Sequence, residues 1–125
     1  MAVACGIDIV SVRRIERLFE TYGERFLYKV FPEKVDYCFK KRKGELFGCI
    51  AARFALKEAV IKAFSQLGKN LTFRDIAIEG GGKGLKVQVK KEKEYRLVYS
   101  ISHEREFAIA VVNIVRVPPE KGACN

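Results

Sequence analysis

The chain has 125 residues, 49% of them hydrophobic, which is enough for one compact domain with a core; we expect a single domain over 1–125 with a polar tail from about residue 118. No stretch is apolar enough to cross a bilayer and no basic leader precedes the first apolar run, so neither a membrane span nor a signal peptide is predicted. A cytoplasmic protein is therefore expected. The net charge of +9 predicts a surface that attracts nucleic acid, phosphorylated small molecules or an acidic protein.

The cysteines lack the paired spacing of a zinc site. In a reducing compartment, cysteines of this kind are usually free thiols buried as small hydrophobic side chains. We therefore expect free thiols at all four positions, Cys5, Cys38, Cys49 and Cys124.

The first predicted element is a strand over 3–10, where β-branched residues alternate along the chain. In this strand Asp8 points away from Ile7 and Ile9. Its face is shared with small or apolar residues that leave room beside the carboxylate, namely Ala4, Gly6 and Val10. These are not the neighbours of an ordinary solvated acid, unless the strand lies at the edge of a sheet.

Three helical segments are predicted next. The first spans about 12–22, with apolar residues on one side and basic residues, Arg13, Arg14 and Arg17, on or near the other. A second carries the apolar residues of 26–31. Pro32 is suited to be the first residue of a third helix, because proline is favoured at that position.

A long helix is predicted from about 45 to 66, before a stop signal at Leu67-Gly68. Steps of three and four residues place Glu58 in the middle of an otherwise apolar seam, Phe47, Ala51, Phe54, Ile61 and Ser65. Because a bare buried carboxylate is costly, a cation should lie beside it. The alternative is an exposed ion pair between Glu58 and Lys62, four residues apart.

The rest of the chain predicts antiparallel strands near 71–79, 85–89, 95–102 and 107–115. The last run is apolar on both faces, which indicates a central strand. The glycine-rich segment 80–84 is interpreted first as a flexible hairpin connection, because no helix follows it as in a P-loop; its Lys83 is a weaker candidate for a phosphate contact. The predicted fold class is α+β, with helices packed on a small antiparallel sheet.

Two misplaced carboxylates, Asp8 and Glu58, predict a Mg²⁺ site, since Mg²⁺ binds through one or two carboxylates and completes its shell with water and phosphate oxygens. Phosphate-transfer chemistry becomes the leading class. The single histidine, His103, is either a surface turn residue or a phosphate-contacting or proton-transferring group at a strand end.

Three blocks of the sequence resemble the holo-acyl-carrier-protein synthases, the small bacterial class of 4′-phosphopantetheinyl transferases. They are residues 6–9 (GIDI) followed by Arg14-Ile15, residues 52–59 (ARFALKEA) through 62–64 (KAF), and residues 100–103 (SISH). Order and separation also match, over nearly the whole chain. Two segments depart from the family pattern: the one after the long helix is shorter, and the usual Gly-Lys-Pro reads Gly82-Lys83-Gly84.

The resemblance implies a phosphopantetheinyl-transferase-like fold and transfer of 4′-phosphopantetheine from coenzyme A to a carrier-protein serine, releasing adenosine 3′,5′-bisphosphate, in fatty acid biosynthesis. It implies that Asp8 and Glu58 bind Mg²⁺ and that Lys62 stabilises the leaving phosphate. Phosphate or nucleotide contacts are implied for Arg53 and His103. The helix with Arg13, Arg14, Arg17 and Leu18 is similar to the family's docking helix for the acidic acyl carrier protein.

Members of this size form homotrimers with active sites between subunits, so the resemblance implies the same here, with no nucleic-acid or membrane partner. Two alternatives remain open. A small basic nucleic-acid-binding domain would show steep salt dependence and indifference to Mg²⁺. A degenerate transferase that only docks carrier proteins is the other, although Asp8, Glu58 and Lys62 are all present.

Overall fold

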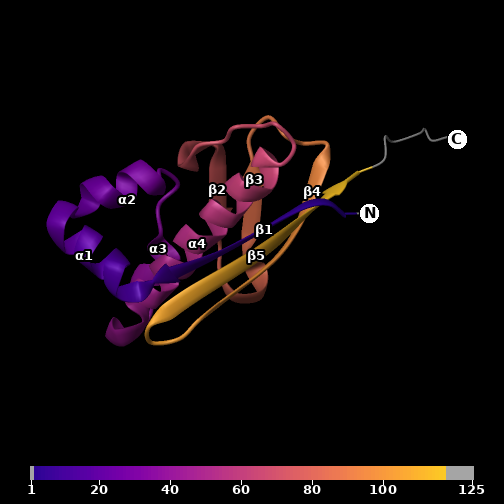
Figure 1. The fold of residues 1–125 in the computed structure, drawn as a ribbon. Helices are drawn as coiled ribbons and strands as arrows, with labels where there is room; N and C mark the ends of the chain where they lie inside the picture. The colour runs from indigo at the N-terminus through magenta and orange to yellow at the C-terminus, as the bar shows by residue number, and fades with distance from the viewer. Residues whose placement is uncertain (1, 118–125) are drawn as a thin grey trace, which may run out of the picture.

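The computed structural model describes residues 2–117 and has an α+β architecture (Figure 1). Short 3-10 turns lie at 43–45, 73–75 and 82–84. The helices and strands, in chain order, are β1 (Ala2–Ser11), α1 (Val12–Tyr22), α2 (Glu24–Val30), α3 (Asp36–Phe39), α4 (Leu46–Ser65), β2 (Ile76–Glu79), β3 (Lys86–Val89), β4 (Tyr95–His103) and β5 (Phe107–Arg116). The predicted polar tail from about residue 118, with Pro118-Pro119, lies outside the described residues.

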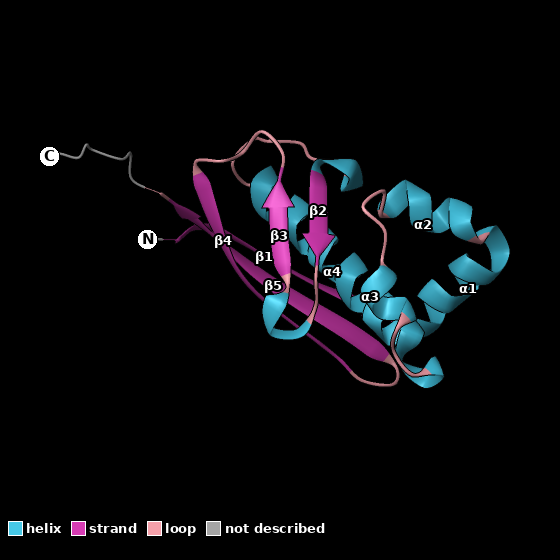
Figure 2. Cartoon of the chain, turned by 180° about the vertical axis from the view of Figure 1, so that it is seen from behind, coloured by secondary structure: helices cyan, strands magenta, loops and turns pink. Residues whose placement is uncertain are grey.

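The strands form two antiparallel sheets, one of three strands in the order β1-β5-β4 and one of two strands, β2-β3 (Figure 2). Helix α4 packs along β1 and β5, and α1 and α3 pack against α4. The predicted fold class is confirmed, and so is the central position of the closing strand. The glycine-rich segment 80–84 is the hairpin connection between β2 and β3, as predicted.

Helix α4 is the centre of the molecule. Of its 20 residues, 14 are buried, and they lie on every side of the helix. An apolar helix that is buried all round belongs to the interior of a protein rather than to its surface. The residues of the predicted apolar seam are thus part of a helix that is buried on every side, and the predicted helix is correct to within one residue at each end. None of the described helices is long and apolar enough to span a membrane.

Pro32 does not begin a helix. After α2 ends at Val30 the chain turns, and α3 begins only at Asp36 and has four residues. In the turn Lys34 adopts φ of 78°, which a right-handed helix excludes. The prediction of a helix from Pro32 is therefore wrong.

The cysteines also differ from expectation. Cys38 in α3 and Cys49 in α4 are buried and form a disulfide, with their Cα atoms 5.5 Å apart. Cys5 is a free thiol but it is exposed. The prediction of free thiols is thus wrong for Cys38 and Cys49, and the prediction of a buried side chain is wrong for Cys5. Cys124 lies outside the described residues.

Candidate active site

A close approach between β1 and α4 places Asp8 beside the long helix. A Cβ atom added to Gly6 would lie 2.0 Å from the carbonyl oxygen of Ala59, so only glycine allows the strand to cross the helix at this distance. Asp8 follows two residues later and points to the same side, and Ile7 and Ile9 point away into solvent. The predicted orientation of Asp8 is confirmed. β1 is an edge strand of its sheet.

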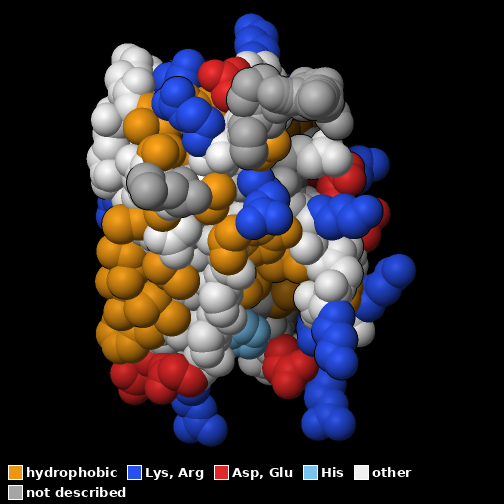
Figure 3. Space-filling view, turned by 90° about the vertical axis from the view of Figure 1, so that its right-hand side faces the viewer, with side chains coloured by type: hydrophobic (Ala, Val, Ile, Leu, Met, Phe, Trp, Pro, Cys, Tyr) orange, Lys and Arg blue, Asp and Glu red, His pale blue; other side chains and the backbone are white. Residues whose placement is uncertain are grey.

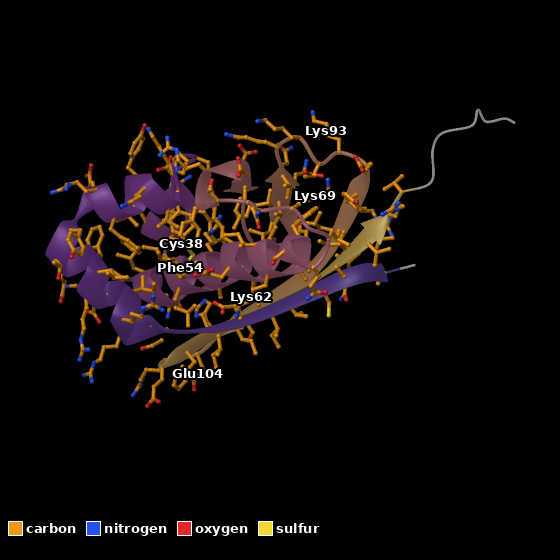
Figure 4. The ribbon with its side chains drawn as sticks, turned by 45° about the horizontal axis from the view of Figure 1, so that its top comes forward. Cys38, Phe54, Lys62, Lys69, Lys93 and Glu104 are labelled. Atoms are coloured by element: carbon orange, nitrogen blue, oxygen red, sulfur yellow. A yellow bond between two sulfur atoms is a disulfide. The ribbon has the colours of Figure 1, made fainter. Side chains whose placement is uncertain are left out.

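Lys62 of α4 lies opposite Asp8. Its Nζ donates to Asp8 Oδ1 at 2.8 Å and to the Ile7 carbonyl oxygen at 3.2 Å, and Figure 4 places it between α4 and β1. The Asp8 side chain is 15% exposed and that of Lys62 is 55% exposed. This bond to Asp8 raises the pKa of Lys62. The alternative of an ion pair between Glu58 and Lys62 is wrong, because the lysine reaches across to β1 instead.

Glu58 lies on α4 one turn before Lys62 and is half-buried. Burial raises the pKa of Glu58 and the nearby charge of Asp8 raises it further, whereas Lys62 and Arg14 lower it. The guanidinium of Arg14, from α1, lies 5.7 Å from the ring centroid of Phe54. Two acids and two cations therefore influence one another here, and we call Asp8, Glu58 and Lys62 the acidic site.

The acidic site offers two carboxylates of hard oxygen donors, one from a strand and one from a helix. Among the described residues no group of three or more His, Cys, Asp or Glu side chains could hold a metal ion. A complete protein cage of the kind that Ca²⁺ or Zn²⁺ takes is therefore lacking within residues 2–117. Two carboxylates fit Mg²⁺ instead, because this ion completes its shell with water and phosphate oxygens.

A second group of predicted residues lies between α4, which carries Arg53, and the end of β4, which carries His103. Arg53 and His103 line one cavity of about 210 Å³, together with Tyr37, Lys41 and the backbone of Gly81-Gly82. Arg53 donates to the Gly80 carbonyl oxygen, and its guanidinium lies 5.2 Å from the ring centroid of Tyr37. We call this cavity the basic pocket.

Two glycines shape the basic pocket. A Cβ atom on Gly81 would lie 2.2 Å from the Tyr37 ring, and one on Gly48 would lie 2.6 Å from His103 Nδ1. Each glycine thus lets an aromatic ring pack on the backbone, one on the hairpin and one on α4. Burial lowers the pKa of Arg53, and the nearby Tyr37 and Glu33 raise it.

The acidic site and the basic pocket face different sides of α4. Arg53 and Glu58 are five residues apart, which is about 140° around a helix axis at 3.6 residues per turn. The structure therefore brings Asp8, Glu58 and Lys62 together and, separately, Arg53 and His103. Lys83 lies exposed in the turn 82–84 and is not among the described residues that line the pocket.

The predicted docking residues lie on α1. Arg13, Arg14 and Arg17 are exposed and Leu18 is half-buried, while Ile15 fixes the helix to the core. The Ser11 hydroxyl accepts from the Arg14 backbone N–H at 3.2 Å and caps the helix. The Arg14 side chain lies toward the acidic site, since it contacts the Phe54 ring and lowers the pKa of Glu58.

Sequence reasoning missed a buried ion pair. Lys57 is fully buried, and its Nζ donates to Glu33 and to the carbonyl oxygens of Val30 and Phe73, at 2.7–3.0 Å. Glu33 also accepts from the Ile78 backbone N–H at 3.0 Å. Burial lowers the pKa of Lys57, and Glu33 raises it. The sequence did contain one signal for this ion pair, because Lys57 is a charged residue in the same apolar run as Glu58.

Tyr37 and Lys41 were also missed. The Lys41 ammonium lies 4.9 Å from the Tyr37 ring centroid, so that ring carries a cation from each of two segments. The basic run 40–43 was visible in the sequence, but its charge alone did not indicate a site.

Residues 4–112 match the 4′-phosphopantetheinyl transferase superfamily. A holo-(acyl-carrier-protein) synthase of Halothermothrix orenii is 43% identical over 117 residues, covering 86% of this chain and 92% of that protein. The crystal structure of the Helicobacter pylori synthase in complex with coenzyme A is 39% identical, with a TM-score of 0.73, covering 88% of this chain and 98% of that one.

The synthase from Bacillus anthracis, solved in complex with CoA (3′,5′-ADP), is 28% identical with a TM-score of 0.74, covering 94% of this chain and 99% of that one. Sequence and fold thus agree over nearly the whole described length. The chain belongs to the 4′-phosphopantetheinyl transferase superfamily.

Proposed function

We propose that this chain is a holo-acyl-carrier-protein synthase, which transfers 4′-phosphopantetheine from coenzyme A to a serine of an apo-acyl carrier protein in fatty acid biosynthesis. The second product is adenosine 3′,5′-bisphosphate. The observation that carries the proposal is the acidic site, where Asp8, Glu58 and Lys62 meet in a chain whose 43%-identical relative is named a synthase of this kind.

In the acidic site, Asp8 and Glu58 would hold Mg²⁺ beside the pyrophosphate of coenzyme A. The bound ion would supply Lewis-acid chemistry, screening the charge of the phosphate groups while the serine attacks. Lys62, which donates to Asp8 across the site, is positioned to stabilise the charge on the leaving phosphate.

The basic pocket supplies the remaining charge for coenzyme A. Arg53 and His103 contact phosphate or nucleotide, with Tyr37 and Lys41 on the same wall and Lys83 nearby on the hairpin. A cluster of cations on a rigid helix and a strand end suits an anionic ligand.

Helix α1 docks the carrier protein. Its exposed arginines, Arg13, Arg14 and Arg17, meet the acidic surface of the partner, and Leu18 adds an apolar contact. Because Arg14 also lies close enough to Glu58 to affect its pKa, docking on α1 brings the serine to the acidic site.

The protein assembles as a homotrimer with active sites between subunits. The outward face of the three-stranded sheet exposes large apolar residues, and Figure 3 shows a broad hydrophobic area on one flank of the molecule. The set on this sheet is Val3, Ile7, Ile9, Val98, Phe107, Ile109 and Val111. A neighbouring subunit on this face would cover it and could bring its basic pocket to the acidic site.

We place the protein in the cytoplasm, as a single domain without nucleic-acid or membrane partners.

The first experiment is mass spectrometry of apo-acyl carrier protein incubated with this protein, coenzyme A and Mg²⁺, beside a chelated control. A metal-dependent gain of one phosphopantetheine is expected. No gain with several carriers, together with salt-dependent nucleic-acid binding that ignores Mg²⁺, would favour the nucleic-acid alternative instead; carrier binding without turnover would favour the docking-only one.

A further inference from the structure

One large cavity among the described residues belongs to neither the acidic site nor the basic pocket. It has a volume of about 620 Å³ and lies between β3 and β4, which run side by side in Figures 1 and 2. These two strands are edges of different sheets, since β3 pairs only with β2 and β4 only with β5 among the described strands. We call this cavity the edge groove.

The floor of the edge groove is apolar. Half-buried side chains of β2, β3 and β4 and the buried Val89 line it, and the Tyr95 ring makes an edge-on contact with Phe64, at 5.5 Å between ring centroids. The floor residues are Ala77, Val87, Val89, Tyr95, Leu97 and Tyr99. A ligand with an aliphatic part would remove this surface from water.

The rim of the edge groove is basic. Five exposed cations line it, Lys86, Lys90, Lys91, Lys93 and Arg96, and none of them is in an ion pair within residues 2–117. Glu92, the one acid among the described residues that line the groove, is already paired with Lys69 at 3.3 Å. Lys86 faces Glu79 across the β2–β3 pair, whereas the turn 90–94 carries three lysines against one remaining acid, the exposed Glu94. The rim therefore suits an anion.

Links between β3 and β4 bound the edge groove at both ends. At one end the Tyr99 hydroxyl donates to the Leu85 carbonyl oxygen at 2.8 Å, and at the other the turn 90–94 joins the two strands. Between them β3 has four residues, or about 13 Å at 3.3 Å per residue. A groove bounded over so short a length suits a small ligand better than an added strand.

Lysines on edge strands also prevent unwanted pairing between sheets. That role requires only the charges; it does not require an apolar floor or a cavity of this volume beneath them. Together the floor, the rim and the bounded ends describe a container for a small amphiphilic anion.

We propose that the edge groove binds a medium-chain fatty acid carboxylate, with its tail on Val87 and Leu97 and its carboxylate beside Lys90 and Lys93. This inference goes beyond the proposed transfer reaction and does not depend on it.

The test is calorimetric titration of the full-length protein with decanoate below its micelle concentration. One decanoate per chain is expected. Decanol keeps the tail without the charge and should bind at least about tenfold more weakly, and butyrate keeps the charge without the tail and should not bind detectably. Equal binding of butyrate would reveal only a basic surface and would overturn the proposal.

Two matched variants locate the site. Lys90→Glu with Lys93→Glu should weaken decanoate binding at least about tenfold, whereas Arg25→Glu with Lys29→Glu changes the charge equally on the exposed side of α2 and should leave it unchanged. If the charge reversal impairs folding, Lys90→Gln with Lys93→Gln replaces it.

Methyl NMR spectra distinguish the groove from the apolar sheet face. Decanoate should shift the methyl signals of Val87 and Leu97 and leave those of Ile7 and Ile109 in place. Shifts confined to Ile7 and Ile109, loss of affinity in the α2 variant, or displacement of decanoate by an acidic peptide would each overturn the proposal.

Discussion

At the scale of single residues, Glu58 combines function with a cost to the fold. Burial and the charge of Asp8 raise the pKa of Glu58 above its ordinary value of 4.5. The folded protein therefore holds the Glu58 proton more tightly than the unfolded chain does. The stability that this proton contributes is full below pH 4.5 and is lost as the pH rises through the raised pKa. Glu58→Gln removes this charge. Without metal at neutral pH, its melting temperature should equal or exceed that of the wild type, and the difference should vanish below pH 4.5.

The same substitution should lower the transfer rate at least about 100-fold, because a catalytic metal contributes several kcal/mol of charge stabilisation. Thermal melts in chelator and a carrier-modification assay measure the two effects separately. Glu20→Gln, on the exposed side of α1, is the matched control. Normal turnover in folded Glu58→Gln would remove Glu58 from the metal site.

We predict that the buried Lys57 side chain stabilises the folded state. Lys57→Met leaves Glu33 buried without its cation, and breaking a buried pair in this way costs about 3–5 kcal/mol. Adding Glu33→Gln should recover part of the loss, because the glutamine oxygen can still accept from the Ile78 N–H. Urea unfolding of the two variants gives the comparison, and a single variant as stable as the wild type would contradict the structure of this pair.

The contrast between Glu58 and Lys57 shows what the sequence can predict at this scale. Both interrupt the same apolar run, and the misfit of Glu58 with that of Asp8 was enough to predict a shared site. The partners of Lys57 come from 16 to 27 residues away, at Phe73, Glu33 and Val30. No local pattern specifies such a convergence, so the role of Lys57 required the fold.

At the scale of elements, the disulfide fixes α3 to α4. Cys38 and Cys49 are 11 residues apart, and closing a loop of that length stabilises the native state by about 3 kcal/mol in the chain-entropy account. Cys38→Ser with Cys49→Ser should lose about this much, and a dithiol reductant should have the same effect on the wild type but none on the variant. Urea unfolding with and without reductant checks this; an unresponsive wild type would show that the thiols are free.

Helix α1 carries the docking prediction. Arg17→Glu is a cleaner test than Arg14→Glu, because Arg14 also lowers the pKa of Glu58. The change should raise the carrier KM about tenfold or more and leave coenzyme A affinity unchanged. Lys93→Glu, far from α1 in Figure 4, is the charge-matched control. A carrier KM unchanged by Arg17→Glu would remove α1 from the docking surface.

The segment between α2 and α3 shows why local signals failed there. Proline at 32 favours a helix start, yet the next residue, Glu33, is held by Lys57 and by the Ile78 N–H. Lys34 then takes a positive φ. Contacts with α4 and β2 thus override the preference of the proline, and α3 starts four residues later.

At the scale of the whole molecule, the pattern of β5 had two meanings. Its run of residues apolar on both faces predicted a central strand, and β5 does lie between β1 and β4. One face packs on α4, but no described element covers the other, where Phe107, Ile109 and Val111 are exposed. Periodicity alone does not tell whether a second layer of the same chain or another subunit covers such a face.

Shared active sites make a sharp prediction about mixed assemblies. Glu58→Gln disables the acidic site and Arg53→Met disables the basic pocket, and each variant alone should be inactive. The prediction assumes that each active site joins the acidic site of one subunit to the basic pocket of the next. An Arg53→Met chain still has a normal acidic site, and a Glu58→Gln chain still has a normal basic pocket. An active site formed from these two halves is therefore intact.

Random mixing of equal amounts would produce intact sites at roughly one quarter of the interfaces. Co-expressed variants should therefore recover about a quarter of the wild-type turnover, measured by carrier modification, with trimer mass confirmed by light scattering. Ile109→Asp, placed on the exposed sheet face, should abolish both the trimer and the recovery because it buries a charge in the subunit interface. Full inactivity of a mixed trimer would confine the active site to one chain and would require Arg53 and Glu58 to act from opposite sides of α4.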